Sequence, residues 1–256
     1  MKVVLLAGGM GTRLGEETHR VPKPMVEVGG RPLLWHIMKH YSAHGLHDFI
    51  ICLGFKGYVI KEYFSNYFLH CSDVTFDMRD GSRELHSHAA EPWRVTLVET
   101  GQNTLTGGRL QRVRQYLGDE SFCMTYGDGV SDVDITSLVK FHRSHGKLAT
   151  VTAVSPPGRF GVLEVESGVV REMHEKPDDG NSLINGGFFV LEPAALDTID
   201  GDSTSWEREP MTRLTERDEL RAFVHRGFWH AVDTLREKQM LEEVWASGNA
   251  PWMKGA

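Results

Sequence analysis

The glycine-rich segment near the start of the sequence has the residue types that bind phosphate. It reads LAGGMGTRL over residues 6–14 and directly follows an apolar run over residues 2–7. Glycines let backbone N–H groups approach an anion closely, and Arg13 adds a positive charge. A structural tight turn is the alternative interpretation of these glycines. The dinucleotide-binding fingerprint needs a third glycine where Leu14 stands, and the segment also lacks the Lys-Ser/Thr pair of a P-loop.

A lysine between two prolines is the second feature that suits phosphate chemistry. Lys23 lies in VPKPM, roughly ten residues after Arg13. Pro22 and Pro24 restrict the backbone on both sides and can hold the ammonium group in a fixed direction. An exposed lysine in a turn is the alternative. Taken together, the glycine amides, Arg13 and Lys23 supply donors and two positive charges, which is what a triphosphate requires.

Two aspartates could supply ligands for Mg²⁺. Asp128 follows an apolar run and lies between two glycines in YGDG, and Asp233 follows the aromatic run in FWHAVDTLREK. Magnesium in proteins commonly takes one or two carboxylates together with substrate phosphates. A turn-forming role is the alternative for Asp128, and a helix N-cap is the alternative for Asp233. Asp132 is predicted to be the N-cap of the helix that follows it.

A row of histidines offers a different kind of chemistry. His36, His40 and His44 recur at every fourth residue, a spacing that can bind a transition metal on one helix face. The HExxH pattern is absent, and the three residues lie at the margin of an apolar stripe. We therefore expect a half-exposed helix flank here rather than a metal site.

The spacing of apolar residues predicts the elements that position these residues. Buried strands are expected where apolar runs lack alternation, and helices where apolar residues recur every three or four positions. The strands are predicted at 2–7, 48–54, 95–100, 121–129, 148–154 and 184–193, and the helices at 31–45, 57–68, 108–117, 132–146 and 234–248. This β-α-β-α order predicts a Rossmann-like α/β fold, with a mixed, mostly parallel sheet and helices on both faces.

Two segments depart from this order. Residues 69–93 are polar and turn-rich, and we expect an excursion from the sheet, as a lid or an oligomer contact. Residues 159–177 suggest a hairpin around Ser167-Gly168. No repeat or linker divides the chain, so a single domain over residues 1–256 is the simplest expectation.

Composition narrows the classes of function. The chain has 256 residues, of which 40% are hydrophobic and 25% charged, as in ordinary soluble proteins. A formal net charge of −7 disfavours nucleic-acid binding, and no apolar run is long enough to span a membrane. Cys52, Cys71 and Cys123 have no CxxC spacing, and we expect free thiols in a protein of the cytoplasm.

Several longer segments, in this order, resemble those of the sugar-1-phosphate nucleotidyltransferases. They include LAGGMGTRL, PKPMVEVGGRPLLWHIMK, YGDG, EKP, INGGFFV and GFWHAVDTLR, and the resemblance covers nearly the whole chain. Members that use dTTP or UTP usually carry a proline soon after Thr-Arg-Leu. Here Glu16-Glu17-Thr18 follows instead, which is similar to the cytidylyl branch of the family.

The resemblance implies a reaction, a cofactor and an assembly. CTP and α-D-glucose 1-phosphate would give CDP-glucose and pyrophosphate in the presence of Mg²⁺, on the nucleotidyltransferase fold. The product would feed the synthesis of CDP-linked deoxysugars or of other cell-envelope sugars such as lipopolysaccharide O-antigen. The family also implies a homo-oligomer, with a hexamer suspected.

The same resemblance assigns roles to individual residues. Catalysis would rest on Arg13, Lys23 and Asp128, and Asp128 and Asp233 would share the metal. The sugar phosphate would be bound by Tyr126, Glu175, Lys176 and Asn185. The nucleotide would be bound by Leu6, Ala7, Gly8, Gly9, Gly11, Thr12, Arg13, Lys23, Thr104 and Arg109.

Three other functions are alternatives to this one. A uridylyl- or thymidylyltransferase acting on glucose 1-phosphate is the alternative within the enzyme class. A non-catalytic sugar-nucleotide sensor is disfavoured, because Arg13, Lys23, Asp128, Lys176 and Asp233 are all present. An NAD-linked oxidoreductase is disfavoured by the missing third glycine.

Overall fold

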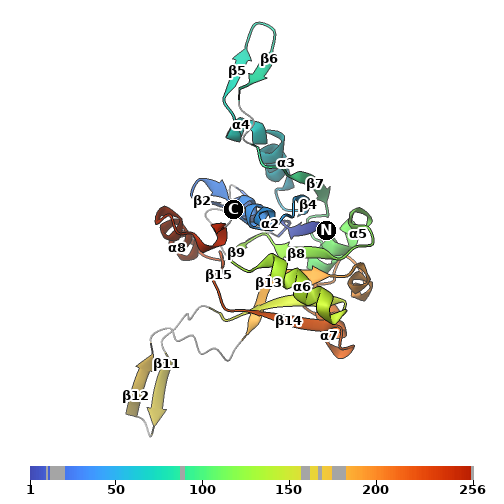
Figure 1. The fold of residues 1–256 in the computed structure, drawn as a ribbon, viewed down its shortest axis with the longest axis vertical. Helices are drawn as coiled ribbons and strands as arrows, with labels where there is room; N and C mark the ends of the chain where they lie inside the picture. The colour runs from blue at the N-terminus through green and yellow to red at the C-terminus, as the bar shows by residue number, and fades with distance from the viewer. Residues whose placement is uncertain are drawn as a thin grey trace.

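A computed structural model describes residues 1–9, 11, 21–86, 90–156, 162–166, 169–174 and 183–254 of the chain. Its centre is a seven-stranded sheet with the order β14-β10-β13-β8-β1-β4-β7 (Figure 1). The neighbouring pairs are parallel except at β13, which runs antiparallel to both β10 and β8. The bounds of these strands are β1 Val3–Leu6, β4 Asp48–Leu53, β7 Arg94–Glu99, β8 Phe122–Tyr126, β10 Ala149–Val154, β13 Ile184–Leu191 and β14 Leu220–His225. The mixed, mostly parallel sheet predicted from the sequence is confirmed.

The central strands lie between two hydrophobic layers. Val3 and Leu5 of β1 point into one layer, while Val4 and Leu6 point into the other. Successive side chains of a strand point to opposite faces, so a strand covered on both faces has no polar side. This is why β1 and β4 appear in the sequence as unbroken apolar runs.

Helices cover both faces of the sheet. The first layer takes buried side chains from α2 Leu33–Ala43, α3 Gly57–Ser65, α6 Ile135–His145 and α8 Leu235–Ala246. The second layer takes them from α5 Thr106–Leu117, the 3-10 turn η3 Pro193–Thr198 and α7 Glu209–Glu216. The predicted second helix is two helices, because the helix from Gly57 ends before Asn66 and a short one, α4 Tyr67–Cys71, follows it.

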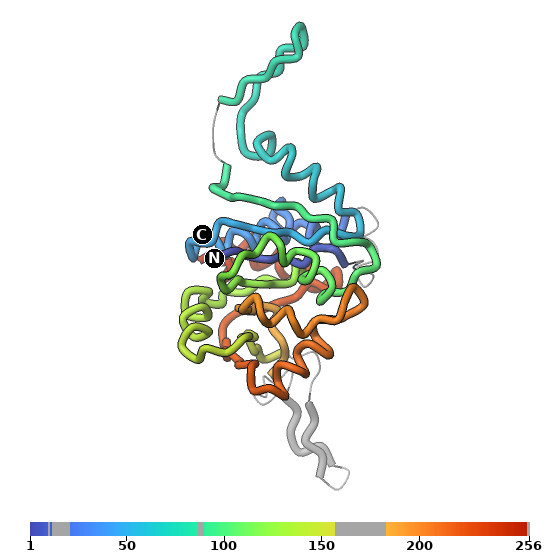
Figure 2. Tube along the Cα trace, turned by 90° about the vertical axis from the view of Figure 1, so that its right-hand side faces the viewer, coloured from blue at the N-terminus to red at the C-terminus, as the bar shows by residue number. Residues whose placement is uncertain are grey.

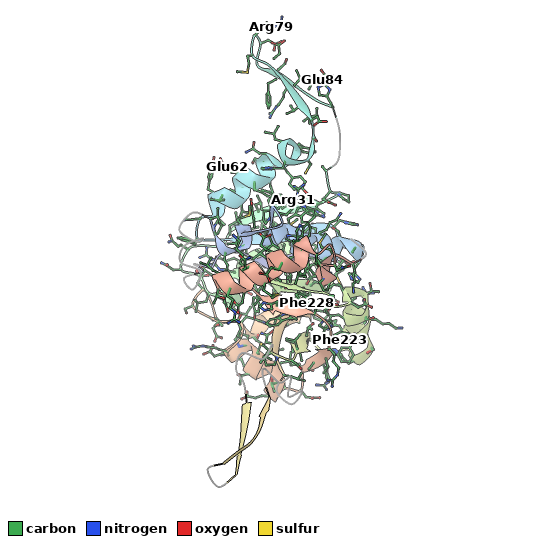
Figure 3. All side chains as sticks on the ribbon, turned by 90° about the vertical axis from the view of Figure 1, so that its left-hand side faces the viewer. Arg31, Glu62, Arg79, Glu84, Phe223 and Phe228 are labelled. Atoms are coloured by element: carbon green, nitrogen blue, oxygen red, sulfur yellow. The ribbon has the colours of Figure 1, made fainter. Side chains whose placement is uncertain are left out.

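The excursion predicted after α3 is a separate hairpin. Strands β5 Val74–Asp77 and β6 Ser82–Leu85 pair only with each other and project from the body of the molecule (Figure 2). Arg79 and Glu84 lie on this projection, far from Phe223 and Phe228 in the body (Figure 3). Strands β11 Val162–Glu166 and β12 Val169–His174 form the second predicted hairpin, and its turn at 167–168 lies outside the described residues.

Two 3-10 turns and two short ladders complete the part of the fold that positions the candidate site. The 3-10 turn η2 Lys23–Met25 precedes a short ladder of β2 Glu27–Val28 and β3 Arg31–Pro32. The 3-10 turn η4 Pro251–Met253 places Trp252 in the first hydrophobic layer. Strands β9 Gly129–Ser131 and β15 Trp229–Ala231 pair antiparallel beside the main sheet.

The cap of α6 differs from the prediction. Asp134, and not Asp132, is its N-cap: the Asp134 side chain accepts a hydrogen bond from the Ser137 backbone N–H at 2.9 Å. Asp132 lies two residues earlier, with a side-chain oxygen 3.0 Å from His225 Nε2. The difference arises because two more residues, Val133 and Asp134, precede the first helical turn.

The described residues contain three cysteines, all free, of which Cys52 and Cys123 are buried. Burial raises the pKa of each of these two thiols to about 12, so they behave as apolar core groups. Among the described helices, none combines the length and apolar character that a membrane crossing needs.

Candidate active site

The ladder of β9 and β15 brings two distant aspartates together. Gly129 pairs with Ala231, and beyond that pair the Val232 N–H donates to the Asp128 carbonyl at 2.9 Å. Asp128 lies just before β9, and Asp233 lies two residues after β15. The antiparallel register therefore places the two carboxylates side by side, although 105 residues separate them in the sequence (233 − 128).

The alternative role of Asp233 as a helix cap is wrong. Thr234 is the N-cap of α8, where its hydroxyl accepts from the Glu237 backbone N–H and the Glu237 side chain accepts from the Thr234 N–H. This reciprocal capping box satisfies the start of the helix without Asp233. The Asp233 side chain is therefore available for the site.

Lys23 lies between the two carboxylates. Its ammonium donates to Asp128 Oδ2 at 2.8 Å and to Asp233 Oδ1 at 2.6 Å. The side chain is only 12% exposed, and the buried Pro24 follows it in η2. Burial acts to lower the pKa of Lys23, but Asp128 and Asp233 outweigh it and the pKa is raised. The lysine is thus a fixed positive charge with three N–H donors, two of which are used by these carboxylates.

The same pair of carboxylates fits a divalent cation. Both bond to one nitrogen atom, so their oxygens converge on a single point at the wall of a cavity. Within the described ranges, no group of three or more histidine, cysteine, aspartate or glutamate side chains could hold a metal ion. Two carboxylates completed by substrate phosphates are nevertheless a common set for Mg²⁺.

A cavity of about 440 Å³ opens at the carboxyl ends of β1 and β8. This is the edge of a parallel sheet at which α/β proteins bind ligands. Its wall is formed by Leu6, Gly8, Gly9, Gly11, Lys23, Pro24, Thr104, Leu105, Thr106, Arg109, Tyr126, Gly127, Asp128 and Asp233. The glycine-rich segment, the lysine and both aspartates therefore face one space.

The side chain of Arg109 lies against the glycine-rich segment and bonds to its backbone. Its buried guanidinium donates to the carbonyls of Gly8 and Leu53, both at 3.0 Å, and to the Thr100 hydroxyl at 2.7 Å. Burial lowers the pKa of Arg109, and the oxygens it bonds to in the described structure are uncharged. A Cβ atom on Gly8 would lie 2.1 Å from Arg109 Nη1, so glycine is required there by close approach.

The sequence predictions can be compared with this arrangement. Ten of the predicted residues line the cavity: Leu6, Gly8, Gly9, Gly11, Lys23, Thr104, Arg109, Tyr126, Asp128 and Asp233. Asn185 is not among the lining residues but donates to the Tyr126 hydroxyl at 3.2 Å. Ala7 is fully buried in the first hydrophobic layer and does not reach the cavity. Thr12, Arg13, Glu175 and Lys176 lie outside the described residues.

Four further lining residues were missed by the sequence analysis: Pro24, Leu105, Thr106 and Gly127. Two of them carried a signal. Pro24 adjoins the predicted Lys23, and Gly127 adjoins the predicted Asp128. A Cβ on Gly127 would lie 2.8 Å from Pro24 Cγ, which shows that these two segments pack directly together.

The histidine row of α2 has a different role from the one its spacing suggests. His36 Nε2 donates to the Val28 carbonyl at 2.8 Å, and His36 Nδ1 accepts from Trp252 Nε1 at 3.2 Å. His40 Nε2 donates to the Val133 carbonyl at 2.8 Å. His36 and His40 are buried, so the expected half-exposed flank is wrong for these two.

Comparisons with known proteins agree with the fold. The profile of the nucleotidyl transferase family matches residues 2–236. The chain belongs to this family. It is 60% identical over 253 residues to a glucose-1-phosphate cytidylyltransferase of Salmonella typhi, and the match covers 98% of each chain.

Solved structures of other proteins share the family fold. HddC from Yersinia pseudotuberculosis matches 95% of this chain and 99% of its own, with a TM-score of 0.70 and 22% identity. A UDP-glucose pyrophosphorylase complexed with UDP-glucose matches 96% of this chain and 98% of its own, with a TM-score of 0.69 and 17% identity. At these identities the likeness concerns the fold alone.

Proposed function

We propose that the protein transfers CMP from CTP to α-D-glucose 1-phosphate, giving CDP-glucose and pyrophosphate. The observation that carries the proposal is the convergence of Lys23, Asp128 and Asp233 on the cavity that the glycine-rich segment lines. The choice of substrates is supported by 60% identity over 98% of the chain to a relative of that name.

The chemistry requires positioning and charge neutralisation more than proton transfer. The nucleophile is a phosphate oxygen of the sugar phosphate, which is already ionised at neutral pH. It forms a bond to the α-phosphorus of the nucleotide, and the bond from that phosphorus to the oxygen bridging to the β-phosphate breaks. Repulsion between the two anions opposes the reaction, as in phosphoryl transfer generally.

The residues on the cavity wall are suited to oppose that repulsion. In this proposal, the backbone of Gly8, Gly9 and Gly11 packs against the nucleotide, with Leu6 and Thr104 beside it. Lys23 keeps one N–H donor for a phosphate oxygen, because two are used by Asp128 and Asp233. At an effective dielectric constant of about 20, two unit charges about 4 Å apart interact by about 4 kcal/mol before desolvation. Arg13 and Lys176 would add positive charge from segments outside the described residues.

Mg²⁺ would be held by Asp128 and Asp233 and, when bound, would neutralise negative charge on the phosphates. The position of Lys23 between the same two carboxylates indicates that they attract a cation. The backbone contact between Asp128 and Val232 fixes the spacing of the pair without help from a ligand.

We also propose that the protein acts as a homo-oligomer in the cytoplasm. The hairpin of β5 and β6 projects from the body and exposes Phe76 and Met78. An isolated two-stranded hairpin is only marginally stable in water, so contact with a second copy would stabilise it. Light scattering coupled to size-exclusion chromatography should give a mass several times 28.8 kDa. A monomer at micromolar concentration would contradict this part of the proposal.

One experiment tests the reaction directly. The protein is incubated with Mg²⁺, glucose 1-phosphate and each of CTP, UTP, dTTP and GTP, and pyrophosphate release is measured. We expect CTP to give the highest kcat/KM. A preference for UTP or dTTP would support the alternative transferases. Binding without release from any of the four would support a sugar-nucleotide sensor.

A further inference from the structure

The carboxylate of Glu207 accepts hydrogen bonds from three hydroxyl groups. Tyr126 donates to Oε1 at 2.7 Å, while Thr106 and Ser205 donate to Oε2 at 2.7 and 2.6 Å. Glu207 lies two residues before α7, and the chain separates it from Tyr126 by 81 positions. Because three donors bond to this one carboxylate, the position of Glu207 determines where their hydroxyl groups point.

Two of these three donors belong to the candidate active site. Tyr126 ends β8 and Thr106 begins α5, and both line the cavity. Glu207 itself is not among the lining residues. Its exposed carboxylate joins two parts of the wall that come from different elements.

Close packing of the backbone places Glu207 there. The Leu105 N–H donates to the Asp202 carbonyl at 2.8 Å, and the Gly107 N–H donates to the Thr204 carbonyl at 3.0 Å. A Cβ on Gly107 would lie 2.8 Å from the Thr204 carbonyl oxygen, and one on Gly108 would lie 2.6 Å from Asp202 Cα. The adjacent glycines of TGGRL thus let the segment before α7 lie against the start of α5.

The hydrogen bonds around Glu207 have only one consistent direction. An ionised carboxylate only accepts, so the single proton of the Tyr126 hydroxyl points at Glu207. The Tyr126 oxygen in turn accepts from Asn185 Nδ2 at 3.2 Å, and Asn185 Oδ1 accepts from the Gly187 N–H at 2.8 Å. The Asn185 amide is therefore oriented by the Gly187 N–H, and it directs one N–H at the Tyr126 oxygen, whose own proton points at Glu207.

The charge states of the two groups agree with this direction. Burial acts to raise the pKa of Glu207, but the hydroxyls of Ser205, Thr106 and Tyr126 outweigh it and the pKa is lowered. Burial and the neighbouring Glu207 carboxylate raise the pKa of Tyr126. At neutral pH the glutamate is thus ionised and the tyrosine is protonated.

We propose that Glu207 is a positioning residue for the sugar phosphate: it fixes the hydroxyl of Tyr126, which also accepts from the amide of Asn185, in the orientation that binds this substrate. The inference rests on the proposed function and on the sugar-phosphate role that the family resemblance implies for Tyr126 and Asn185. Glu207 does not touch the substrate in this proposal. It acts by holding the Tyr126 oxygen in a defined direction beside the Asn185 amide.

The test compares Glu207→Gln with Glu216→Gln, an exposed glutamate of α7 that is not among the residues lining the cavity. The amide retains the shape of the side chain but turns one acceptor into a donor, which conflicts with the hydroxyl groups. We expect Glu207→Gln to raise KM for glucose 1-phosphate about 10-fold, while KM for CTP changes less than twofold. Glu216→Gln should leave both KM values unchanged.

A double-variant cycle separates positioning from a merely structural effect. If Glu207 acts through Tyr126, Tyr126→Phe combined with Glu207→Gln should raise KM for glucose 1-phosphate no more than Tyr126→Phe alone. The inference would be overturned if the two substitutions raised KM for glucose 1-phosphate by the product of their separate effects. It would also be overturned if Glu207→Gln raised KM for CTP as much as KM for glucose 1-phosphate. If Glu207→Gln fails to fold, Glu207→Asp carries the same test, since it keeps the charge but shortens the reach; an unchanged KM for the sugar phosphate would again be contrary.

Failure of this inference is distinguishable from failure of the proposed function. If the unmodified protein releases no pyrophosphate from CTP and glucose 1-phosphate, the proposed function is wrong, and this inference falls with it. If the unmodified protein turns over normally and Glu207→Gln keeps its KM for the sugar phosphate, the positioning role alone is wrong.

Discussion

The lysine–aspartate centre and the histidine row of α2 both look like sites in the sequence, but the fold uses them differently. Lys23, Asp128 and Asp233 come from three distant segments and face a cavity. His36 and His40 come from one helix and turn toward backbone carbonyls in the core. Spacing along one helix therefore says less about function than convergence of several strand ends.

The two regions differ in the hydrogen-bond partners of their polar side chains. In the described structure, both ring nitrogens of His36 have partners, one of them the indole of the buried Trp252. Lys23 has two carboxylate partners and lies on the wall of an open space, where a further anion can approach. The first arrangement stabilises the fold, whereas the second can exchange partners when a substrate binds. Variants in the two regions should accordingly affect different measurements.

The largest expected effect is on catalysis, from Lys23→Ala and Asp128→Ala. Each should lower kcat/KM by two or more orders of magnitude, or about 3 kcal/mol. Lys23→Ala removes a positive charge that stabilises the transition state, and Asp128→Ala removes a carboxylate that would hold Mg²⁺. The measurement is steady-state pyrophosphate release, with circular dichroism as the check on folding. Near-normal turnover in folded Asp128→Ala protein would remove the metal-binding assignment of this residue.

A matched pair of glycine variants should show how the loop beside that centre is supported. Gly8→Ala places a Cβ 2.1 Å from Arg109 Nη1, whereas Gly9→Ala meets nothing within 4 Å. We expect Gly8→Ala to lower the free energy of unfolding by about 2 kcal/mol, since the buried guanidinium must move. Gly9→Ala should leave it within about 0.5 kcal/mol. Equal stabilities in chemical denaturation would contradict the support role of Arg109.

The histidine row should respond to acid through stability. Burial lowers the pKa of His40 to about 4 from its ordinary 6.5. The unfolded chain binds the proton more tightly, so His40 lowers stability as pH falls through the window from 6.5 to 4. Between pH 7 and 5.5 this residue should account for about 1 kcal/mol of lost unfolding free energy. The measurement is urea denaturation of the unmodified protein and His40→Gln at both values of pH.

The exposed His86 on the projecting hairpin provides the control. His86→Gln should keep the full acid dependence of the unmodified protein, while His40→Gln should show a shallower one. Identical pH dependence in all three proteins would show that His40 is not the source.

The smallest effect should come from the cap of α6. Asp134→Ala removes the side chain that accepts from the Ser137 N–H, and should lower the unfolding free energy by about 0.5–1 kcal/mol. The kcat/KM should not change, because Asp134 is not among the residues that line the cavity. Thermal melts and steady-state rates on the same preparation check both statements. A large loss of activity would place α6 in the catalytic machinery. It would contradict the division between residues that act in catalysis and residues that only stabilise the fold.

The sequence predicted the fold well where elements are apolar on both faces. The runs that became β1 and β4 have no polar side, so their pattern is unambiguous. Strand β14 was missed, because its side chains are only partly buried at the edge of the sheet and its pattern includes Arg221 and His225. The cap of α6 was assigned to Asp132 because two aspartates two residues apart both precede the helix.

Local sequence was less informative about the site. Asp233 could equally have been a helix cap, and only the pairing of β9 with β15 and the capping box of Thr234 decide its direction. Glu207 was not foreseen at all, because its partners Thr106 and Tyr126 come from elsewhere in the chain. Contacts across such distances depend on topology, which periodicity does not encode.

The central claim is that the nucleotide lies against the glycine-rich segment beside Lys23. The most direct test is a crystal structure of the protein with CTP and Mg²⁺. We predict a triphosphate within hydrogen-bonding distance of the Lys23 ammonium and the backbone near Gly8 and Gly11, with the metal ion on Asp128 and Asp233. A triphosphate bound elsewhere, away from Lys23 and Gly11, would contradict the account.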